Sequence, residues 1–293
     1  MTDIARADRI PELALDWVHD GRRVALATVV QTWGSAPRPV GAQLAITADA
    51  EMAGSVSGGC VEGAVVAEAI DALEDGTPRI LEFGVSDDEA FAVGLACGGT
   101  IRVLVEPIGV GQGLPVATLE ALVGARGARE PMVYAVEPGG WARALLSANA
   151  PGALGDLVRA ALRNDKSGFV EAEDHEWFLG VHNPPLKLAV VGAVHIAQAL
   201  VPMAQIAGYD VTVIDPREAF ASAARFPDTR LMHDWPDEAL AALSLDTRTA
   251  VVTLTHDPKL DDPAIRAALA SDCFYLGCLG STRTHAKRVA RLE

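Results

Sequence analysis

From Leu186 onward, short apolar segments alternate regularly with segments of helical character. The apolar segments are Leu186–Val191, Val211–Ile214, Arg230–Met232, Thr249–Leu254 and Cys273–Leu279. Apolar strands that alternate with helices are typical of a parallel sheet with helices on both faces. The sequence therefore predicts a doubly wound parallel sheet for the carboxyl-terminal part of the chain.

The residues before this region follow a different pattern, in which short strands are separated by glycine-rich turns. The predicted strands are Val24–Val30, Gln43–Ile46, Ile80–Phe83 and Ile101–Val105. One helix is predicted over Val61–Glu74, because apolar residues recur there at every fourth position. The looser stretch that follows contains predicted helices near Val116–Val123 and Leu154–Leu162 and a predicted strand at Met132–Val136. We expect one mixed α+β domain.

The two patterns meet at His182-Asn-Pro-Pro185. Consecutive prolines hold the chain extended and exclude helix on either side. We therefore expect one domain at residues 1–183 and a second at 184–293. The chain has 293 residues, of which 50% are hydrophobic, and this is enough to bury a core in each domain.

The balance of charges excludes several classes of partner. The chain has 24 Lys and Arg against 39 Asp and Glu, a net charge of −15, which disfavours nucleic acid and anionic membranes. Residues 1–16 are charged and lack the apolar core of a signal peptide, and no apolar run long enough to span a membrane follows. Four scattered cysteines do not make a secreted disulfide framework. We expect a cytoplasmic protein with reduced thiols.

The turn after the first carboxyl-terminal strand partly matches a dinucleotide-binding fingerprint. Gly192 makes the turn, Ala197 is the small residue of the helix, and Asp215 ends the next strand. Val194 stands where the fingerprint has its second glycine. Its branched side chain is expected to intrude on a phosphate and to resist a positive φ. A scaffold turn and an NAD(P) site both stay open, with NAD(P) binding in doubt.

Other polar residues follow predicted strands of this domain, at the edge where an open parallel sheet binds ligands. His195, His256, Ser281 and Arg283 are the candidates for cofactor binding there. Ser281 is expected to cap a helix whose first turns carry cationic groups, which suits a phosphate. For any one of these residues taken singly, however, we expect that Lys287 and Arg288 form only a solvated face and that His256 is a satisfied loop histidine.

Two glycine–cysteine motifs carry the candidate chemistry of the first domain. Cys60 follows Gly58 and Gly59, and Cys97 precedes Gly98 and Gly99. A thiolate at a helix start is stabilised, so Cys60 is expected to be unusually acidic, and the glycines expose backbone N–H groups to a large polar ligand. Buried, inert cysteines are the alternative. Structural zinc is not expected, because no C-x-x-C or histidine cluster lies nearby.

Two further residues flank these motifs. Arg38 lies between two prolines in a loop, where its guanidinium is able to clamp a phosphate, or where it is simply an exposed arginine of a rigid turn. Glu62 follows Cys60 by two residues and is either a proton acceptor or a favourable charge at the helix start.

Three segments of the first domain closely resemble the XdhC/CoxI family: Thr32–Gly41, Gly54–Gly63 and Gly94–Gly99. The resemblance continues through Gly192–Ala197, Asp215–Arg217, Thr255–Asp262 and Gly277–Arg288, and so covers nearly the whole chain. It implies an XdhC/CoxI-type domain followed by a Rossmann-like domain. It also implies a protein that binds the molybdenum cofactor (molybdopterin), protects it during sulfuration and inserts it into a xanthine-dehydrogenase-type apoenzyme.

The resemblance gives the candidate residues a role. Molybdenum is thiophilic, so Cys60 and Cys97 are candidate ligands of the cofactor's metal, and cationic residues are candidates for its phosphate. The implied partners are the apoenzyme and a cysteine desulfurase, and a homodimer is expected on base rates. Val194 departs from the family's usual glycine, and relatives usually continue beyond this carboxyl end. An accessory protein rather than an enzyme is expected. An NAD(P)-dependent oxidoreductase and an assembly factor that does not touch the cofactor are the alternatives.

Overall fold

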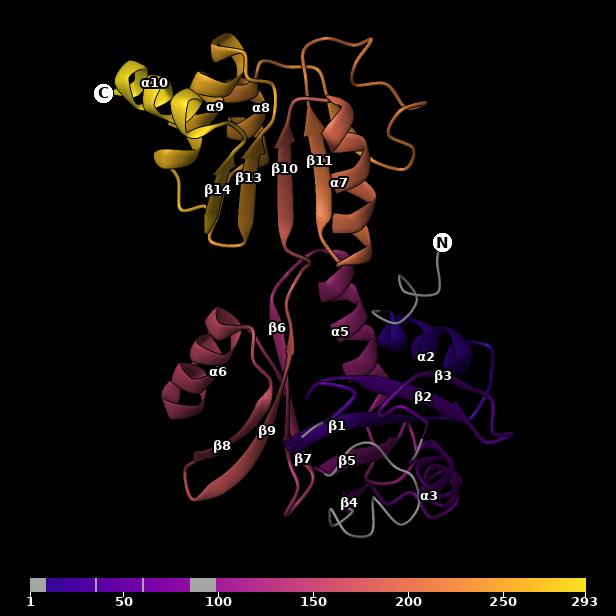
Figure 1. The fold of residues 1–293 in the computed structure, drawn as a ribbon. Helices are drawn as coiled ribbons and strands as arrows, with labels where there is room; N and C mark the ends of the chain where they lie inside the picture. Colours follow the sequence, from indigo (N-terminus) through magenta and orange to yellow (C-terminus); the bar gives the residue numbers. More distant parts are fainter. Residues whose placement is uncertain (1–8, 35, 60, 85–98) are drawn as a thin grey trace. The chain divides into compact units, whose positions relative to one another are not determined.

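The computed structural model describes residues 9–34, 36–59, 61–84 and 99–293. The chain forms two compact units, which divide between Pro184 and Pro185 (Figure 1).

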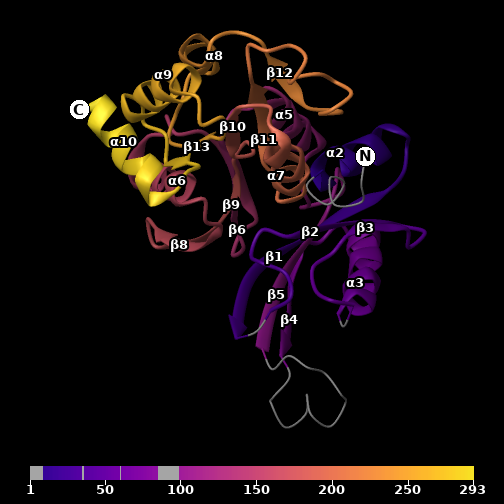
Figure 2. The same cartoon turned by 45° about the horizontal axis from the view of Figure 1, so that its top comes forward.

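The first unit contains a five-stranded antiparallel sheet with the strand order β3-β2-β1-β5-β4. Its strands are β1 (Val24–Gly34), β2 (Gln43–Thr47), β3 (Met52–Gly54), β4 (Arg79–Gly84) and β5 (Gly99–Pro107). Helix α3 (Glu62–Asp75) packs on one face through Val65, Ala69 and Leu73, as the four-residue repeat predicts (Figure 2). It ends at Gly76, whose φ of 71° suits glycine.

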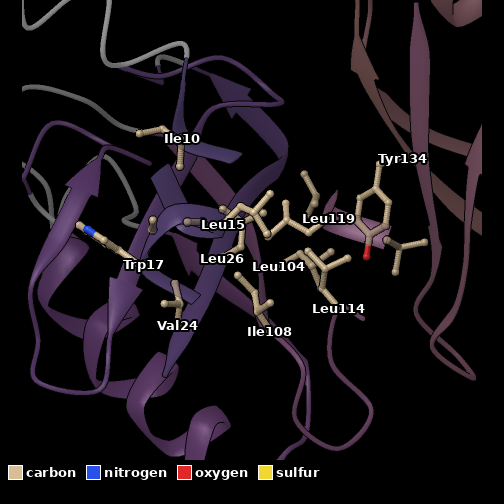
Figure 3. Close-up of a cluster of buried hydrophobic side chains, with 14 of the residues drawn as sticks. Ile10, Leu15, Trp17, Val24, Leu26, Leu104, Ile108, Leu114, Leu119 and Tyr134 are labelled. Atoms are coloured by element: carbon tan, nitrogen blue, oxygen red, sulfur yellow. The ribbon is translucent and has the colours of Figure 1, made fainter. Parts of the chain in front are cut away.

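The opposite face of this sheet is covered by α2 (Ile10–His19) and α5 (Val116–Gly127). Their side chains pack with Leu26 of β1 and Leu104 of β5 in one continuous core (Figure 3). The first seven residues of β1 and the last five of β5 are therefore buried. Within these two strands, the solvent-accessible residues lie at the carboxyl end of β1 and the amino end of β5.

A second sheet in the first unit has the strand order β7-β6-β9-β8 and packs against α6 (Gly152–Asn164). Its strands are β6 (Met132–Glu137), β7 (Ala142–Leu146), β8 (Gly168–Ala172) and β9 (His175–His182). Of these, only β6 is predicted from the sequence. Glu173 and Asp174 form the β8–β9 turn with φ values of 53° and 64°, a conformation usually signalled by Asn or Gly. The mixed α+β class of this unit is confirmed.

The second unit contains a five-stranded parallel sheet with the strand order β12-β11-β10-β13-β14. Its strands are β10 (Lys187–Val191), β11 (Asp210–Ile214), β12 (Arg230–Met232), β13 (Thr249–Thr253) and β14 (Tyr275–Cys278). Its helices are α7 (His195–Ile206), α8 (Pro236–Leu243), α9 (Pro258–Leu269) and α10 (Thr282–Leu292).

Helix α7 packs on one face of this sheet, and α8 and α9 pack on the other. The predicted doubly wound sheet is therefore confirmed. The chain order reverses direction between β10 and β13, and the carboxyl ends of these two strands are where such sheets bind ligands. Within the described ranges, no helix is long and apolar enough to cross a membrane.

Candidate functional site

The glycine-rich loops of the first unit meet at one end of the five-stranded sheet. Gly34, the last residue of β1, lies opposite Gly99, the first residue of β5. The loop that follows β1 also contacts the loop that follows β3, because a Cβ atom added to Gly58 would lie 3.6 Å from the ring of Pro37. Gly58 and Gly59 are exposed to solvent. The segments that carry Arg38, Gly58, Gly59 and Gly99 thus converge on one region.

Cys60, Cys97 and Gly98 lie outside the described residues. Their part in the site therefore stays a prediction. The residues next to them are described: Gly59 and Val61 flank position 60, and Gly99 follows position 98.

The carboxylate of Glu62 organises the loop that precedes α3. Its Oε1 accepts hydrogen bonds from the Ser57 backbone N–H at 2.9 Å and from Ser55 Oγ at 3.0 Å. Its Oε2 accepts from Ser57 Oγ at 2.5 Å and from the Gly59 N–H at 3.0 Å. The side chain is buried, so few positions are left for a ligand. Glu62 therefore fixes the path of residues 55–59.

The same contacts decide the charge of Glu62. Burial raises the pKa of this carboxyl, but the hydrogen bonds from Ser57 and Ser55 together lower the pKa by more than burial raises it. The pKa therefore lies below its usual value. An ionised carboxylate with four donors is a poor proton acceptor near neutral pH. The structure thus favours a loop-ordering role for Glu62. Sequence reasoning missed Ser57, because it precedes Glu62 by five residues and so lacks the three-residue spacing of a capping box; the N-cap of α3 is Val61.

Arg38 is half-buried, and its Nε–H is buried without a hydrogen-bond partner. A buried donor with no acceptor costs about 1–3 kcal/mol. An anionic group bound beside this loop is able to offset that cost. Arg38 is therefore the described cation of the region best suited to an anionic ligand.

The second unit has its polar residues at the carboxyl ends of the parallel strands. Gly192 follows β10 with a φ of 109°, and a Cβ atom there would lie 2.5 Å from Cγ2 of Thr255. The turns after β10 and β13 are therefore in direct contact. Val194 has a φ of −83°, so the expected backbone strain at this position is wrong. Its half-buried side chain packs against the apolar core beneath α7.

Asp215, at the end of β11, is fully buried and already has its partners. Arg217 donates to both of its oxygens, from Nε at 2.8 Å and from Nη2 at 2.7 Å. The backbone N–H groups of Arg217 and Ala193 also donate to it, at 3.0 and 2.9 Å. Burial raises the pKa of Asp215, but these donors together lower the pKa by more than burial raises it. The pKa of Asp215 therefore lies below its usual value. A ribose hydroxyl would have to displace Arg217 to reach this carboxylate.

The remaining predicted residues of this unit lie around the same edge. His195 is exposed at the first position of α7, and His256 is exposed with a φ of 61° and donates its backbone N–H to Asp261 at 3.0 Å. Ser281 caps α10 by accepting a hydrogen bond from the Thr284 N–H, and Arg283 is exposed in the first turn. Among the residues that the structure describes, no group of three or more His, Cys, Asp or Glu is placed to hold a metal ion.

The expectation that Arg288 belongs to a solvated face is wrong. Its side chain is buried, lies 3.6 Å from Asp261 and donates to the Leu279 carbonyl at 3.0 Å. Asp261 also accepts from the Thr255 hydroxyl at 2.6 Å. Arg288 and Asp261 thus link the turns that follow β14 and β13. Lys287, by contrast, is exposed as expected.

Comparisons with known proteins cover both units. Residues 17–84 match the XdhC and CoxI family, and residues 188–293 match the XdhC Rossmann domain. The chain is 30% identical over 286 residues to the molybdenum cofactor insertion chaperone PaoD of Escherichia coli (strain K12), covering 97% of this chain and 75% of that protein. It is 27% identical over 291 residues to a probable xanthine dehydrogenase subunit of Bacillus subtilis (strain 168), covering 94% of this chain and 83% of that protein.

A solved structure has the same fold. The crystal structure at 2.80 Å of a protein described as a xanthine dehydrogenase from Bacillus halodurans gives a TM-score of 0.75 with 23% sequence identity. The match covers 100% of this chain and 86% of that one.

Proposed function

This chain belongs to the XdhC and CoxI family, and from this membership we propose that it is a chaperone that binds the molybdenum cofactor and inserts it into an apoenzyme. The class of function comes from the Escherichia coli relative, which is named a molybdenum cofactor insertion chaperone. The cofactor is here the cargo of the protein, not the resident group of an enzyme.

The observation that carries the proposal is the meeting of the glycine-rich loops at one end of the first unit's sheet. Gly58 and Gly59 leave the backbone open to a large ligand, and Glu62 holds their loop in place. Arg38 adds a buried, unpaired donor that suits an anionic group. Residues with this combination of space, rigidity and positive charge fit a bulky anionic cargo.

We assign roles within this site as follows. Cys60 and Cys97 are the sulfur ligands or sulfur-transfer contacts for the thiophilic molybdenum, and Arg38 holds the phosphate of the pterin. Glu62 does not touch the cargo but positions the loop beside Cys60. The cargo is held while a cysteine desulfurase supplies the terminal sulfur, and it then passes to an apoenzyme of the xanthine dehydrogenase type. We further propose that the protein acts in the cytoplasm as a homodimer.

An NAD(P)-dependent oxidoreductase is the weaker candidate. The ordinary φ of Val194 removes one objection to a nucleotide in the second unit, but the paired state of Asp215 adds another. We therefore propose that the turn after β10 is a scaffold. Titration with NADH and NADPH, followed by fluorescence, tests this point, because tight binding by the intact chain would favour the oxidoreductase.

The proposed function is tested by retention of the cofactor. The intact chain is mixed with molybdenum cofactor under anaerobic conditions and passed through a gel-filtration column. We expect molybdenum and pterin to elute with the intact chain and much less of both to elute with the Cys60→Ala variant. The Cys273→Ala variant is the matched control, because Cys273 lies in the second unit, and it is expected to retain the cofactor. Failure of the intact chain to retain the cofactor would contradict the proposal.

A further inference from the structure

Strand β1 extends beyond its partner β2 and continues alongside β5 alone. The pairing of β1 with β2 ends at Thr28, and after an irregularity between Val29 and Gln31 the register with β5 continues to Gly34. In this extension Gln31 lies opposite Arg102 and Trp33 lies opposite Thr100. Because side chains alternate along a strand, Gln31, Trp33 and Arg102 share one face of the sheet.

The two faces of this extension differ in their packing. Ile101 points to the face covered by α3 and is part of its buried core. On the other face, Trp33 is 81% exposed, the highest value among the large apolar side chains that the structure describes. An indole left in water forgoes the free energy that its burial would provide. A tryptophan that gains nothing for the fold is well placed to contact a ligand.

A cation is held in place on the same face of the sheet as Trp33. Arg102 donates from Nη1 to Oε1 of Gln31 at 3.0 Å, and its guanidinium lies 5.1 Å from the ring centroid of Phe169 in β8. These contacts reduce the freedom of a long side chain before any ligand binds, so less entropy is lost on binding. The extension thus presents an aromatic surface and, diagonally across the ladder, a pre-oriented positive charge.

This pair of groups selects a class of ligand. A planar ring stacks on an indole, and a guanidinium attracts an anionic substituent of that ring. The pair lies where the glycine-rich loops meet, because Trp33 immediately precedes Gly34, which faces Gly99. We infer that Trp33 and Arg102 form the platform on which the pterin ring of the cofactor rests, and that Arg102 shares the contact with the cofactor's phosphate with Arg38. This inference rests on the proposed function and assigns two cofactor contacts to it.

The test measures the dissociation constant of the cofactor by anaerobic equilibrium dialysis, with molybdenum cofactor released from a purified molybdoenzyme as the probe. Trp33→Ala and Arg102→Gln are each expected to raise the constant by about tenfold, the size of a lost stacking or charge-assisted contact. Trp33→Phe keeps a ring and is expected to stay within about threefold of the intact chain. The control is Trp235→Ala, which removes a tryptophan that is 49% exposed in the second unit.

The outcomes separate the inference from the proposed function. If the intact chain does not bind the probe, the proposed function fails first. If the intact chain binds it and Trp33→Ala binds it equally well, with unchanged circular dichroism, the platform is wrong and the chaperone role stands. Unchanged cofactor binding with loss of apoenzyme capture would also overturn the platform, because Trp33 would then be a protein contact.

Discussion

Replacing Glu62 with glutamine should loosen the loop that precedes α3. In Glu62→Gln an NH₂ group takes the place of the oxygen that accepts from the Gly59 N–H, so that two donors face each other. A fully buried donor without a partner costs about 1–3 kcal/mol, but Gly59 is exposed, so water replaces part of its lost contact, while the other hydrogen bonds lose their charge assistance. We expect a loss of about 1–2 kcal/mol in the free energy of unfolding of the first unit. Urea titration followed by tryptophan fluorescence measures it.

The pH dependence of this variant has a defined sign. The pKa of Glu62 in the folded chain lies below its ordinary value of 4.5. Its contribution is therefore present above pH 4.5 and is lost as the pH falls through the lowered pKa. The glutamine variant should show a flatter decline of stability in this acidic range than the intact chain.

A matched control separates loop order from general stability. Glu137 holds the glycine turn between β6 and β7 with its carboxylate, which accepts from the N–H groups of Gly139 and Gly140 at 2.6 Å each. Glu137→Gln should lower stability by a similar amount and leave cofactor retention unchanged, whereas Glu62→Gln should reduce retention. A stability change below about 0.5 kcal/mol for Glu62→Gln, or an equal loss of retention in both variants, would refute the reasoning.

Three other substitutions test the packing. Arg143→Met leaves the carboxylate of Glu106 buried without its ion-pair partner at 2.7 Å, which should lower the free energy of unfolding by about 3–5 kcal/mol. Adding Glu106→Leu should recover part of this loss. A double variant that is less stable than the single one in urea would contradict the pairing argument. Burial and Arg126 lower the pKa of His182 from 6.5 to about 3. The free energy of unfolding should therefore fall by up to about 1.4 kcal/mol for each pH unit below 6.5. His182→Gln should remove this part of the acid sensitivity, as measured by urea titrations at about pH 7 and about pH 5. Gly192→Ala places a Cβ atom on a residue with a φ of 109°, 2.5 Å from Cγ2 of Thr255, and should lower the melting temperature of the second unit. Adding Thr255→Ser removes that methyl group and should restore the melting temperature only in part. Full recovery would show that backbone strain contributes nothing.

Much of the fold follows from periodicity in the sequence. Helix α3 and the strands of the second unit are predicted within a few residues, because their apolar residues recur at the spacing of buried elements. Strands β8 and β9 are not predicted, since both carry charged residues and their turn uses Glu173 and Asp174 in place of glycine. The approach of Gly34 to Gly99 depends on the register of β1 with β5, which is a long-range property.

The candidate site is predicted in part. The glycine motifs and Arg38 are recognised as single segments, but their convergence and the role of Glu62 depend on contacts that spacing alone does not specify. Arg288 resembles a surface residue in sequence because charged neighbours surround it, yet the fold buries it beside Asp261. Val194 is expected to be strained because it stands at a glycine position of the fingerprint, yet its backbone has an ordinary negative φ.

Delivery of the cofactor tests the chaperone role most directly. A xanthine-dehydrogenase-type apoenzyme is incubated with limiting, sulfurated molybdenum cofactor during brief exposure to air, with the intact chain, with its Cys60→Ala variant or with an unrelated carrier protein. We predict that the intact chain raises the yield of active enzyme well above the other two mixtures. Equal yields in all three would contradict a role in holding and inserting the cofactor.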